Sequence, residues 1–293
     1  MRATTGRRPP FADLTWLAEE QIFDDRTCQA VFVETLSLEN LAWARRCLDA
    51  GKHVLIDKPP TPAFAAFRAL LEDAESRGLH TQVAYQYRYL PAFEFALDWA
   101  RSGRLGRLFR VRAYLPTQRG VYERWYPVAS AMPGGVMHEL GSHMVDLVVS
   151  LLGRPDRVTS VLRADNVDFG RPPFVDNAIA LLEYPGVLAE IDSMVELVDA
   201  TPLRHFGIHG TRGSVIVEPL EPDPTVRLCL DEARDGYAKG WQEIPIPGRT
   251  RDEGDVEEFV AVVCDGRPPR FPKRHELLVE ETLLRACGAP PDG

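Results

Sequence analysis

Short apolar runs alternate with longer amphipathic segments across the first third of this 293-residue chain. The runs QAVFVET, KHVLID and LHTQVAYQY have the length and β-branched content of buried strands. The segments between them begin at a capping residue, Ser37 or Thr61, and stop at a glycine, Gly51 or Gly78. Strands that alternate with helices in this way predict parallel βαβ units with helices on both faces of the sheet.

The pattern changes after Gly103, where strand-like segments follow one another across short turns. These segments are LFRVRAYLP, NAIALLEY, VLAEIDSMVEL, HFGIHG, SVIVEP and VRLCLDE, and two helices, DVEEFVAVVCDG and HELLVEETLLRACG, close the chain. We therefore predict an α/β plus α+β protein of two domains. Residues 1–100 would form an incomplete Rossmann-like domain with a parallel sheet. Residues 101–293 would form a domain with a large, mostly antiparallel open sheet.

The composition excludes several classes of protein. A formal net charge of −9 does not provide the basic field that a nucleic acid needs. The apolar runs are too short to cross a bilayer, so we expect no membrane partner. The five cysteines are scattered and never spaced as CxxC, which predicts reduced thiols and a cytoplasmic protein rather than a disulfide framework or zinc site.

The stretch GGVMHELGSHMVDL, residues 134–147, carries ionisable groups inside an apolar run. On a regular α-helix Glu139, His143 and Asp146 fall within about 60° of one another, and the remaining circumference is mostly apolar. A carboxylate one turn from a histidine can fix its tautomer and keep its pKa near working pH, as a general base requires. The alternative is a half-exposed helix with ordinary i,i+4 pairs.

The letters HELGSH also resemble the zinc-protease motif HExxH, which needs its histidines four residues apart on one helical face. His138 and His143 are five residues apart, or about 140° around the helix. They cannot chelate one ion from a regular helix, and we expect no metal site of this kind.

A lysine follows the second predicted strand in the stretch GKHVLIDKPP. Ligands of parallel sheets bind at the carboxyl ends of the strands, and Lys58 comes out at such an end, before a pair of prolines. Lysine supplies a compact charge with a movable pKa. Taken alone, this residue is better explained as a strand end that happens to be charged.

Together, GKHVLIDKP at residues 51–59 and GGVMHELGSHMVD at residues 134–146 resemble motifs of the glucose–fructose oxidoreductase / inositol dehydrogenase / MocA family. The resemblance implies that Lys58 is the catalytic lysine and His143 the catalytic histidine. Glu139 stands at the family's aspartate position, and Asp146 matches an acidic residue one turn further on.

The same resemblance implies the chemistry. The family oxidises a sugar or polyol hydroxyl and passes hydride to NAD or NADP. His143 would accept the hydroxyl proton, and Lys58 would stabilise the negative charge that develops on the oxygen. Glu139 would orient the histidine. A homo-oligomer, associated through the sheet of the second domain, is implied in the same way.

Two positions depart from the family pattern. Asp57 replaces the usual glutamate and Glu139 the usual aspartate, and each exchange moves a carboxylate by about one methylene. The loop before the glycine pair supplies candidate substrate contacts, which could equally be loop anchors. These are Arg124, Trp125 and Tyr126.

The dinucleotide fingerprint GxGxxG does not occur in the sequence. The cluster Gly207, Gly210 and Gly213 lies between two predicted strands, where a turn explains it better. Compared with the family, the chain lacks the first strand, the glycine turn, the first helix and the second strand. We expect either a misassigned start or a fragment of a longer dehydrogenase, in preference to a genuine short form, because the catalytic residues are otherwise in place.

Some cofactor contacts could remain at the strand ends, although we expect weak binding of NAD(P) without the glycine turn. The candidates are Glu34, Thr35, Asp57, Lys58, Tyr87 and Arg88.

Three functions stay open at this point. The leading one is an NAD(P)-dependent oxidoreductase that acts on a sugar-like alcohol. The second is a catalytically inactive relative that binds sugars or oligomerises. The third is a metal-dependent sugar isomerase or lyase that would use Glu139, His143 and Asp146.

Overall fold

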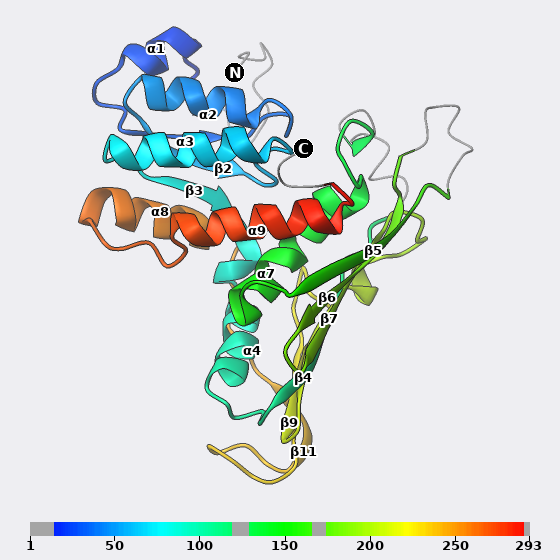
Figure 1. Ribbon diagram of the computed structural model, residues 1–293. Coiled ribbons are helices and arrows are strands. Elements are labelled where there is room, and N and C mark those ends of the chain that lie inside the picture. The colour runs from blue at the N-terminus through cyan, green and yellow to red at the C-terminus, as the bar shows by residue number, and fades with distance from the viewer. Residues whose placement is uncertain (1–14, 119–128, 166–173, 290–293) are drawn as a thin grey trace.

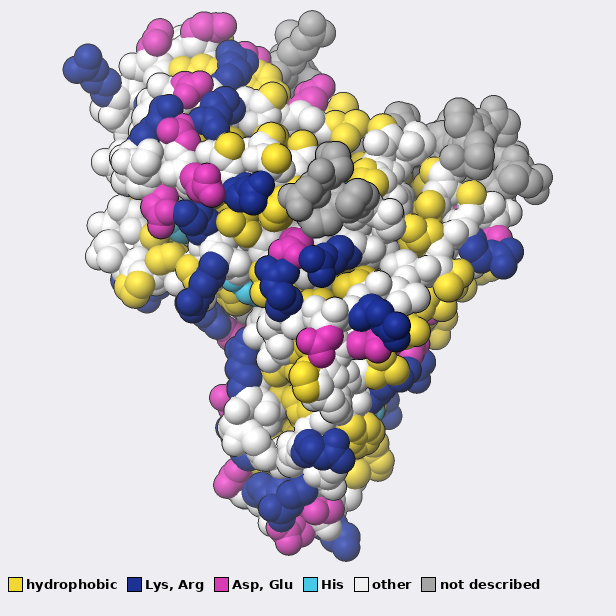
Figure 2. Space-filling view, viewed as in Figure 1, with side chains coloured by type: hydrophobic (Ala, Val, Ile, Leu, Met, Phe, Trp, Pro, Cys, Tyr) yellow, Lys and Arg dark blue, Asp and Glu magenta, His cyan; other side chains and the backbone are white. Residues whose placement is uncertain are grey.

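The structure, a computed structural model, describes residues 15–118, 129–165 and 174–289, and it contains two β-sheets with helices packed on them (Figure 1). A small sheet lies at one end of the molecule, and a long curved sheet extends away from it. Figure 2 shows basic side chains interspersed with acidic ones over the same face. No helix within the described ranges is long and apolar enough to span a bilayer.

The first sheet has three parallel strands in the order β1-β2-β3, as the sequence predicts. Its strands are β1 (Ala30–Val33), β2 (His53–Asp57) and β3 (Thr81–Ala84). Helices lie on both faces (Figure 1): α2 (Asn40–Asp49) and α3 (Phe64–Ser76) on one, α8 (Glu253–Asp265) and α9 (Lys273–Ala286) on the other, with the short α1 (Glu19–Asp24) before β1. On β2, Val54 and Ile56 join the main core, whereas Leu55 packs with Phe259 of α8.

The second sheet has eight strands in the order β11-β10-β9-β8-β4-β7-β6-β5. All neighbouring pairs are antiparallel except β4 and β7, which confirms the predicted mostly antiparallel open sheet. Its strands are β4 (Leu108–Tyr114), β5 (Arg157–Arg163), β6 (Asn177–Tyr184), β7 (Val187–Met194), β8 (His205–Gly210), β9 (Gly213–Val217), β10 (Val226–Leu230) and β11 (Gly240–Ile244). The sequence patterns did not predict β5 and β11, the two edge strands.

One face of this sheet is covered by helices (Figure 1). These are α4 (Pro91–Arg101), α7 (Ser142–Leu152) and part of α9, accompanied by the short helices η2 (Gln86–Tyr89) and η3 (Met137–Gly141). A further short helix, η4 (Thr201–Leu203), precedes β8. Strand β6 shows the reason, because Ala178, Ala180 and Leu182 are buried while Ile179 between them is exposed. Alternating side chains face opposite sides of a strand, so the inner face of β6 requires a cover.

The C-terminal helices join the two sheets. Helix α9 contacts α3 and β3 of the first sheet as well as α7 and β5 of the second. The main hydrophobic core is continuous and includes residues of both sheets, such as Val54 and Val111. The end of β2 and the start of α7 are therefore held in one packed body.

Candidate active site

A cavity of about 340 Å³ lies at the carboxyl ends of β1 and β2. Glu34 and Thr35 follow β1, and Asp57 and Lys58 come at the end of β2. Glu139 of η3 lines the same cavity, so residues from both sheets meet there. This placement agrees with the general position of ligand sites in parallel sheets.

Lys58 and Glu139 form an ion pair across the boundary between the two parts of the chain. Nζ of Lys58 donates to Oε1 of Glu139 at 2.8 Å and to its backbone oxygen at 3.0 Å. The side chains are 12% and 25% exposed, respectively, so the pair is partly shielded yet open to the cavity. The sequence predicted a common site for these two residues, and the structure brings them together.

The segment that carries Glu139 is not the regular α-helix assumed from the sequence. Met137–Gly141 is a π-helical turn, and the α-helix begins at Ser142. A π turn holds one extra residue, which rotates Glu139 away from the stripe calculated at 100° per residue. A Cβ on Gly141 would lie 2.5 Å from Sδ of Met137, so a larger residue there would require the Met137 side chain to move.

His143 lies in the first turn of α7 and is 5% exposed. The rings of Tyr85 and Tyr87 pack against it, with centroids 6.2 and 5.0 Å away. Burial lowers the pKa of His143 well below its usual 6.5, and the charges of Lys58 and Arg251 act in the same direction. The imidazole is therefore neutral at physiological pH and able to accept a proton.

No hydrogen bond joins Glu139 to His143 among the described residues, in contrast to the predicted carboxylate–imidazole couple. Glu139 is bound to Lys58, and Nδ1 of His143 is buried without a partner in the described part of the chain. His143 is not part of the cavity wall, but its ring contacts Tyr85 and Tyr87, the chain neighbours of the wall residue Gln86. The charges of Lys58 and Arg251, which do line the cavity, act on the ring and lower its pKa further.

Asp146 and Arg88 lie together in a buried network and do not line the cavity. Nε and Nη2 of Arg88 donate to Asp146 at 2.7–3.0 Å, and Nη1 and Nη2 donate to Glu276 at 2.8 Å. Nε2 of His275 lies 3.0 Å from the same aspartate. Both Arg88 and Asp146 have fully buried side chains. The catalytic role predicted for Asp146 and the cofactor contact predicted for Arg88 find no geometric support here.

Tyr87, another predicted cofactor contact, is also buried away from the cavity, stacked on Phe93 and against His143. The candidate substrate contacts Arg124, Trp125 and Tyr126 lie outside the described residues. Within the described ranges, no three His, Cys, Asp or Glu side chains come together to hold a metal ion.

Burial changes the acidity of two carboxyl groups in the cavity wall. It raises the pKa of Asp57 to about 6, although the Lys58 ammonium opposes the rise. It raises the pKa of Asp255 to about 8. The sequence patterns did not identify Asp255 as a site residue. The sequence carries only a weak indication of its burial, because Asp255 precedes the core residue Phe259 by four positions and so shares a helical face with it.

The sequence patterns also missed other polar residues of the cavity wall, which come from η2 and from the segments that precede α2 and α8. These are Ser37, Gln86, Arg251 and Asp252.

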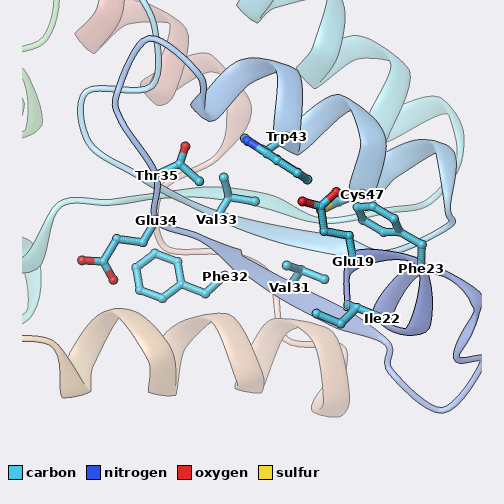
Figure 3. Close-up of a pocket in the computed structure, with 10 residues that line it drawn as sticks. All are labelled: Glu19, Ile22, Phe23, Val31, Phe32, Val33, Glu34, Thr35, Trp43 and Cys47. Carbon is cyan, nitrogen blue, oxygen red and sulfur yellow. The ribbon is translucent and has the colours of Figure 1, made fainter. Parts of the chain in front are cut away.

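A second hollow lies along the free edge of β1 and differs in character (Figure 3). Its lining is mostly apolar, with Ile22 and Phe23 from α1, Val31 from β1 and Trp43 from α2. Glu34 borders both hollows, and Figure 3 shows its carboxylate turned away from Trp43. The first cavity, with its charged side chains, is therefore the better candidate for an active site.

The first cavity fits one part of a dinucleotide. Its polar wall, with a buried and unpartnered Oδ1 on Asp255, leaves hydrogen-bonding capacity for a polar ring substituent. A glycine-rich turn that would cradle the pyrophosphate is absent from the sequence. The polar wall therefore suits a polar ring substituent of such a cofactor.

Comparison with known proteins finds two matching family models. Residues 6–85 match the model described as an oxidoreductase family with an NAD-binding Rossmann fold, and residues 93–216 match the GFO/IDH/MocA C-terminal domain.

Individual relatives agree with these family models. The chain is 29% identical to the uncharacterized oxidoreductase YhhX of Escherichia coli over 240 residues, which cover 80% of this chain and 66% of YhhX. It is 26% identical over 267 residues to D-xylose 1-dehydrogenase (NADP(+)) 2 of Haloferax volcanii, covering 90% of this chain and 78% of the relative. A crystal structure of the probable oxidoreductase yhhX superimposes with a TM-score of 0.75 at 23% identity, covering 96% and 86% of the two chains.

Proposed function

From the premise that this chain belongs to the GFO/IDH/MocA oxidoreductase family, we propose that it oxidises a hydroxyl group of a sugar or polyol with NAD or NADP as the hydride acceptor. The observation that carries the proposal is the meeting of Lys58 and Glu139 at a cavity beside the neutral His143. The sugar dehydrogenase named among the relatives, which uses NADP(+), supports the substrate class and the cofactor.

Lys58 would act on the substrate oxygen. As a hydroxyl loses its proton and hydride, negative charge develops on that oxygen, and an ammonium placed beforehand stabilises it. Glu139 holds the ammonium in position through its 2.8 Å ion pair. The pair is shielded from bulk water, so the interaction is stronger than it would be at an exposed surface.

His143 would accept the hydroxyl proton. Its burial keeps the imidazole neutral, and the positive charge of Lys58 nearby keeps it so until the proton arrives. Asp146 takes a positioning role in this proposal, because Arg88 and His275 fix it in the core and thereby fix α7. When bound, the nicotinamide cofactor would supply the hydride acceptor.

Four residues would contact the cofactor, namely Glu34, Thr35, Asp57 and Lys58, which all line the cavity. We expect weak affinity for the dinucleotide in this chain, because its sequence has no GxGxxG turn to bind the phosphates. The second candidate is a family member that binds sugars or associates with other copies, and it would show no redox turnover.

We propose a cytoplasmic location and a homo-oligomeric state for the protein. The five cysteines are all free, which suits a reducing compartment. The eight-stranded sheet exposes large hydrophobic side chains, among them Phe109, Val161 and Ile179, which suits an interface between copies.

The test is an oxidation assay. The chain is incubated with NAD or NADP and a panel of aldoses and polyols, and formation of the reduced nicotinamide is followed by absorbance. We expect turnover with at least one polyol, reduced by about 10²- to 10³-fold in Lys58→Met. The control Lys273→Met removes a lysine that pairs with Glu75 at the surface, and it should leave turnover unchanged. Absence of turnover with every combination would favour the inactive candidate.

A further inference from the structure

Asp255, on α8, lines the cavity together with residues of the first sheet. The side chain is almost entirely buried, at 3% exposure, yet it lines the cavity together with Gln86. Its Oδ1 atom has no hydrogen-bond partner in the described part of the chain. A buried polar atom without a partner costs free energy unless something binds to it. The position therefore has unused hydrogen-bonding capacity at a ligand cavity.

The backbone around Asp255 is held firmly. Nε2 of Gln82, on β3, donates to the backbone oxygen of Asp255 at 3.1 Å. Gly254 lies so close to η2 that a Cβ there would be 2.2 Å from Cβ of Tyr89. Helix α8 can approach η2 only because residue 254 is a glycine, and this approach sets Asp255 next to Gln86. The carboxyl group is thus fixed relative to the cavity.

Several charged groups act on this carboxyl. Burial raises the pKa of Asp255 to about 8, and Arg88 of η2 opposes the rise. Asp252, which precedes α8, Asp146 of α7 and Glu276 of α9 add to it. The positive end of the α8 dipole also opposes it. Burial dominates, so at neutral pH the group is mostly a neutral acid with one O–H donor and one carbonyl acceptor.

We propose that Asp255 is the cavity's binding group for a primary carboxamide, the group that nicotinamide carries, an inference that rests on the proposed function. A neutral carboxyl group and a carboxamide are complementary, since each offers one donor and one acceptor side by side. Gln86, in the same wall, can add a further hydrogen bond.

The rest of the cavity fits this assignment. Glu34, Asp57 and Asp252 line it, so a phosphate group would meet a largely acidic wall. Lys58 is paired with Glu139 and, in the proposed function, acts on the substrate oxygen. A neutral carboxamide is the polar group of the cofactor that suits the part of the wall formed by Asp255 and Gln86.

The experiment measures binding rather than turnover. Nicotinamide mononucleotide is titrated into the full chain by isothermal titration calorimetry, because this probe carries the carboxamide without depending on a complete dinucleotide site. Nicotinic acid mononucleotide, with a carboxylate in place of the carboxamide, is the comparison ligand. We expect the wild type to prefer the carboxamide by about tenfold or more near pH 6.5.

Two substitutions separate the chemistry from the packing. Asp255→Leu should weaken binding of nicotinamide mononucleotide by about tenfold or more, because it removes both donor and acceptor. Asp255→Asn keeps a donor and an acceptor and should bind at wild-type level. Wild-type binding should weaken as the pH rises through about 8, where the carboxyl loses its proton, whereas Asp255→Asn should show no such loss. Asp98→Asn on α4, which does not line the cavity and has a side chain 66% exposed, is the matched control and should retain both the binding and its pH dependence.

The inference alone fails if Asp255→Leu binds the probe as tightly as the wild type, if the two ligands bind equally, or if Asp255→Asn keeps the loss above pH 8. A third titration, with glucuronamide, tests whether the carboxamide could come from a substrate. Tighter binding of glucuronamide than of nicotinamide mononucleotide would overturn the assignment to the cofactor. If the wild type binds neither nucleotide and oxidises no polyol, the proposed function fails as well.

Discussion

At the scale of single residues, the cavity combines a fixed cation with a neutral base. The ion pair with Glu139 holds the Lys58 ammonium at 2.8 Å, and burial keeps the His143 imidazole uncharged. Two positive groups so close together would repel each other, and the low pKa of His143 avoids that cost until a proton is transferred. A lysine must be charged to stabilise an oxyanion, and a histidine must be neutral to accept a proton.

The histidine should control the acid limb of the pH–rate profile. Its folded-state pKa lies well below 6.5, so kcat should hold down to that range and fall only at lower pH, as the imidazole takes up a proton. His143→Gln should lower kcat by about 10²- to 10⁴-fold, change KM little and abolish this limb. The measurement is kcat against pH for both proteins.

His209→Gln is the matched control for this profile. His209 also has a pKa lowered by burial, but it lies on β8 and hydrogen-bonds Ser214 at 2.9 Å. Its substitution should leave the acid limb in place. If His143→Gln keeps wild-type turnover, or keeps the limb, the histidine is not the base.

At the scale of elements, one buried network joins three helices. Arg88 belongs to η2, Asp146 to α7, and Glu276 and His275 to α9. The Arg88 guanidinium also lies over the rings of Tyr85 and Phe271, at 4.8 and 4.3 Å, so nearly all of its surface is in contact. The pKa of Asp146 is lowered despite full burial, chiefly through Arg88, which keeps the pair charged. The network fixes the helix that carries His143.

Breaking this network should be costly, because removing one partner leaves charges buried without compensation. Arg88→Met should lower the free energy of unfolding by about 3–5 kcal/mol, as measured by urea denaturation. Arg157→Met removes a comparable contact to Glu183, but the side chains there are 69% and 40% exposed. It should cost less than about 1 kcal/mol. Equal losses of unfolding free energy in the two variants would show that the buried network stabilises the fold no more than an exposed ion pair does.

The sequence predicted most of the elements because their patterns are strong. The apolar runs of β2 and β6 are buried, as continuous or alternating patterns require. Strands β5 and β11 were missed because both are sheet edges, where about every second side chain is polar or exposed and hydrophobic periodicity is weak. The π turn at Glu139 was missed because angles on a helical wheel assume a uniform helix.

The site was predicted in part. Two motifs distant in the sequence pointed to Lys58 and Glu139, and the fold brings them into contact. The pairing of carboxylates with cations depends on how the elements pack, which residue spacing does not reveal. Spacing therefore placed Asp146 in the site, whereas in the fold Asp146 pairs with Arg88 in the core. Asp255 could not be recognised as a cavity residue, because α8 meets the first sheet only through the tertiary fold.

At the scale of the whole molecule, the C-terminal helices return to the first sheet and lock its geometry to the second. Asp255 on α8 and Lys58 after β2 line one cavity although far apart in the sequence. The outer face of the eight-stranded sheet has a different role in the proposal. Val161 and Ile179, which are 61% and 38% exposed, are direct partners across β5 and β6.

Association of copies through this face should be sensitive to charge there. Ile179→Glu should shift the protein toward monomers in sedimentation velocity, since a buried carboxylate would lose its hydration at the interface. Val198→Glu is the control, because Val198 is 96% exposed and does not belong to a strand of the sheet. A wild type that is already monomeric, or an Ile179→Glu protein that associates as the wild type does, would remove this face as the interface.

The central claim is that one cavity, shared by the two parts of the chain, receives both the nicotinamide and the alcohol. The most direct measurement is a crystal structure of the chain soaked with nicotinamide mononucleotide and the polyol that gives turnover. We predict the pyridine ring in the cavity beside Asp255, with a polyol hydroxyl about 3 Å from Nζ of Lys58 and next to His143. Well-ordered ligands bound elsewhere, such as in the apolar hollow beside β1, with nothing at Lys58, would contradict it.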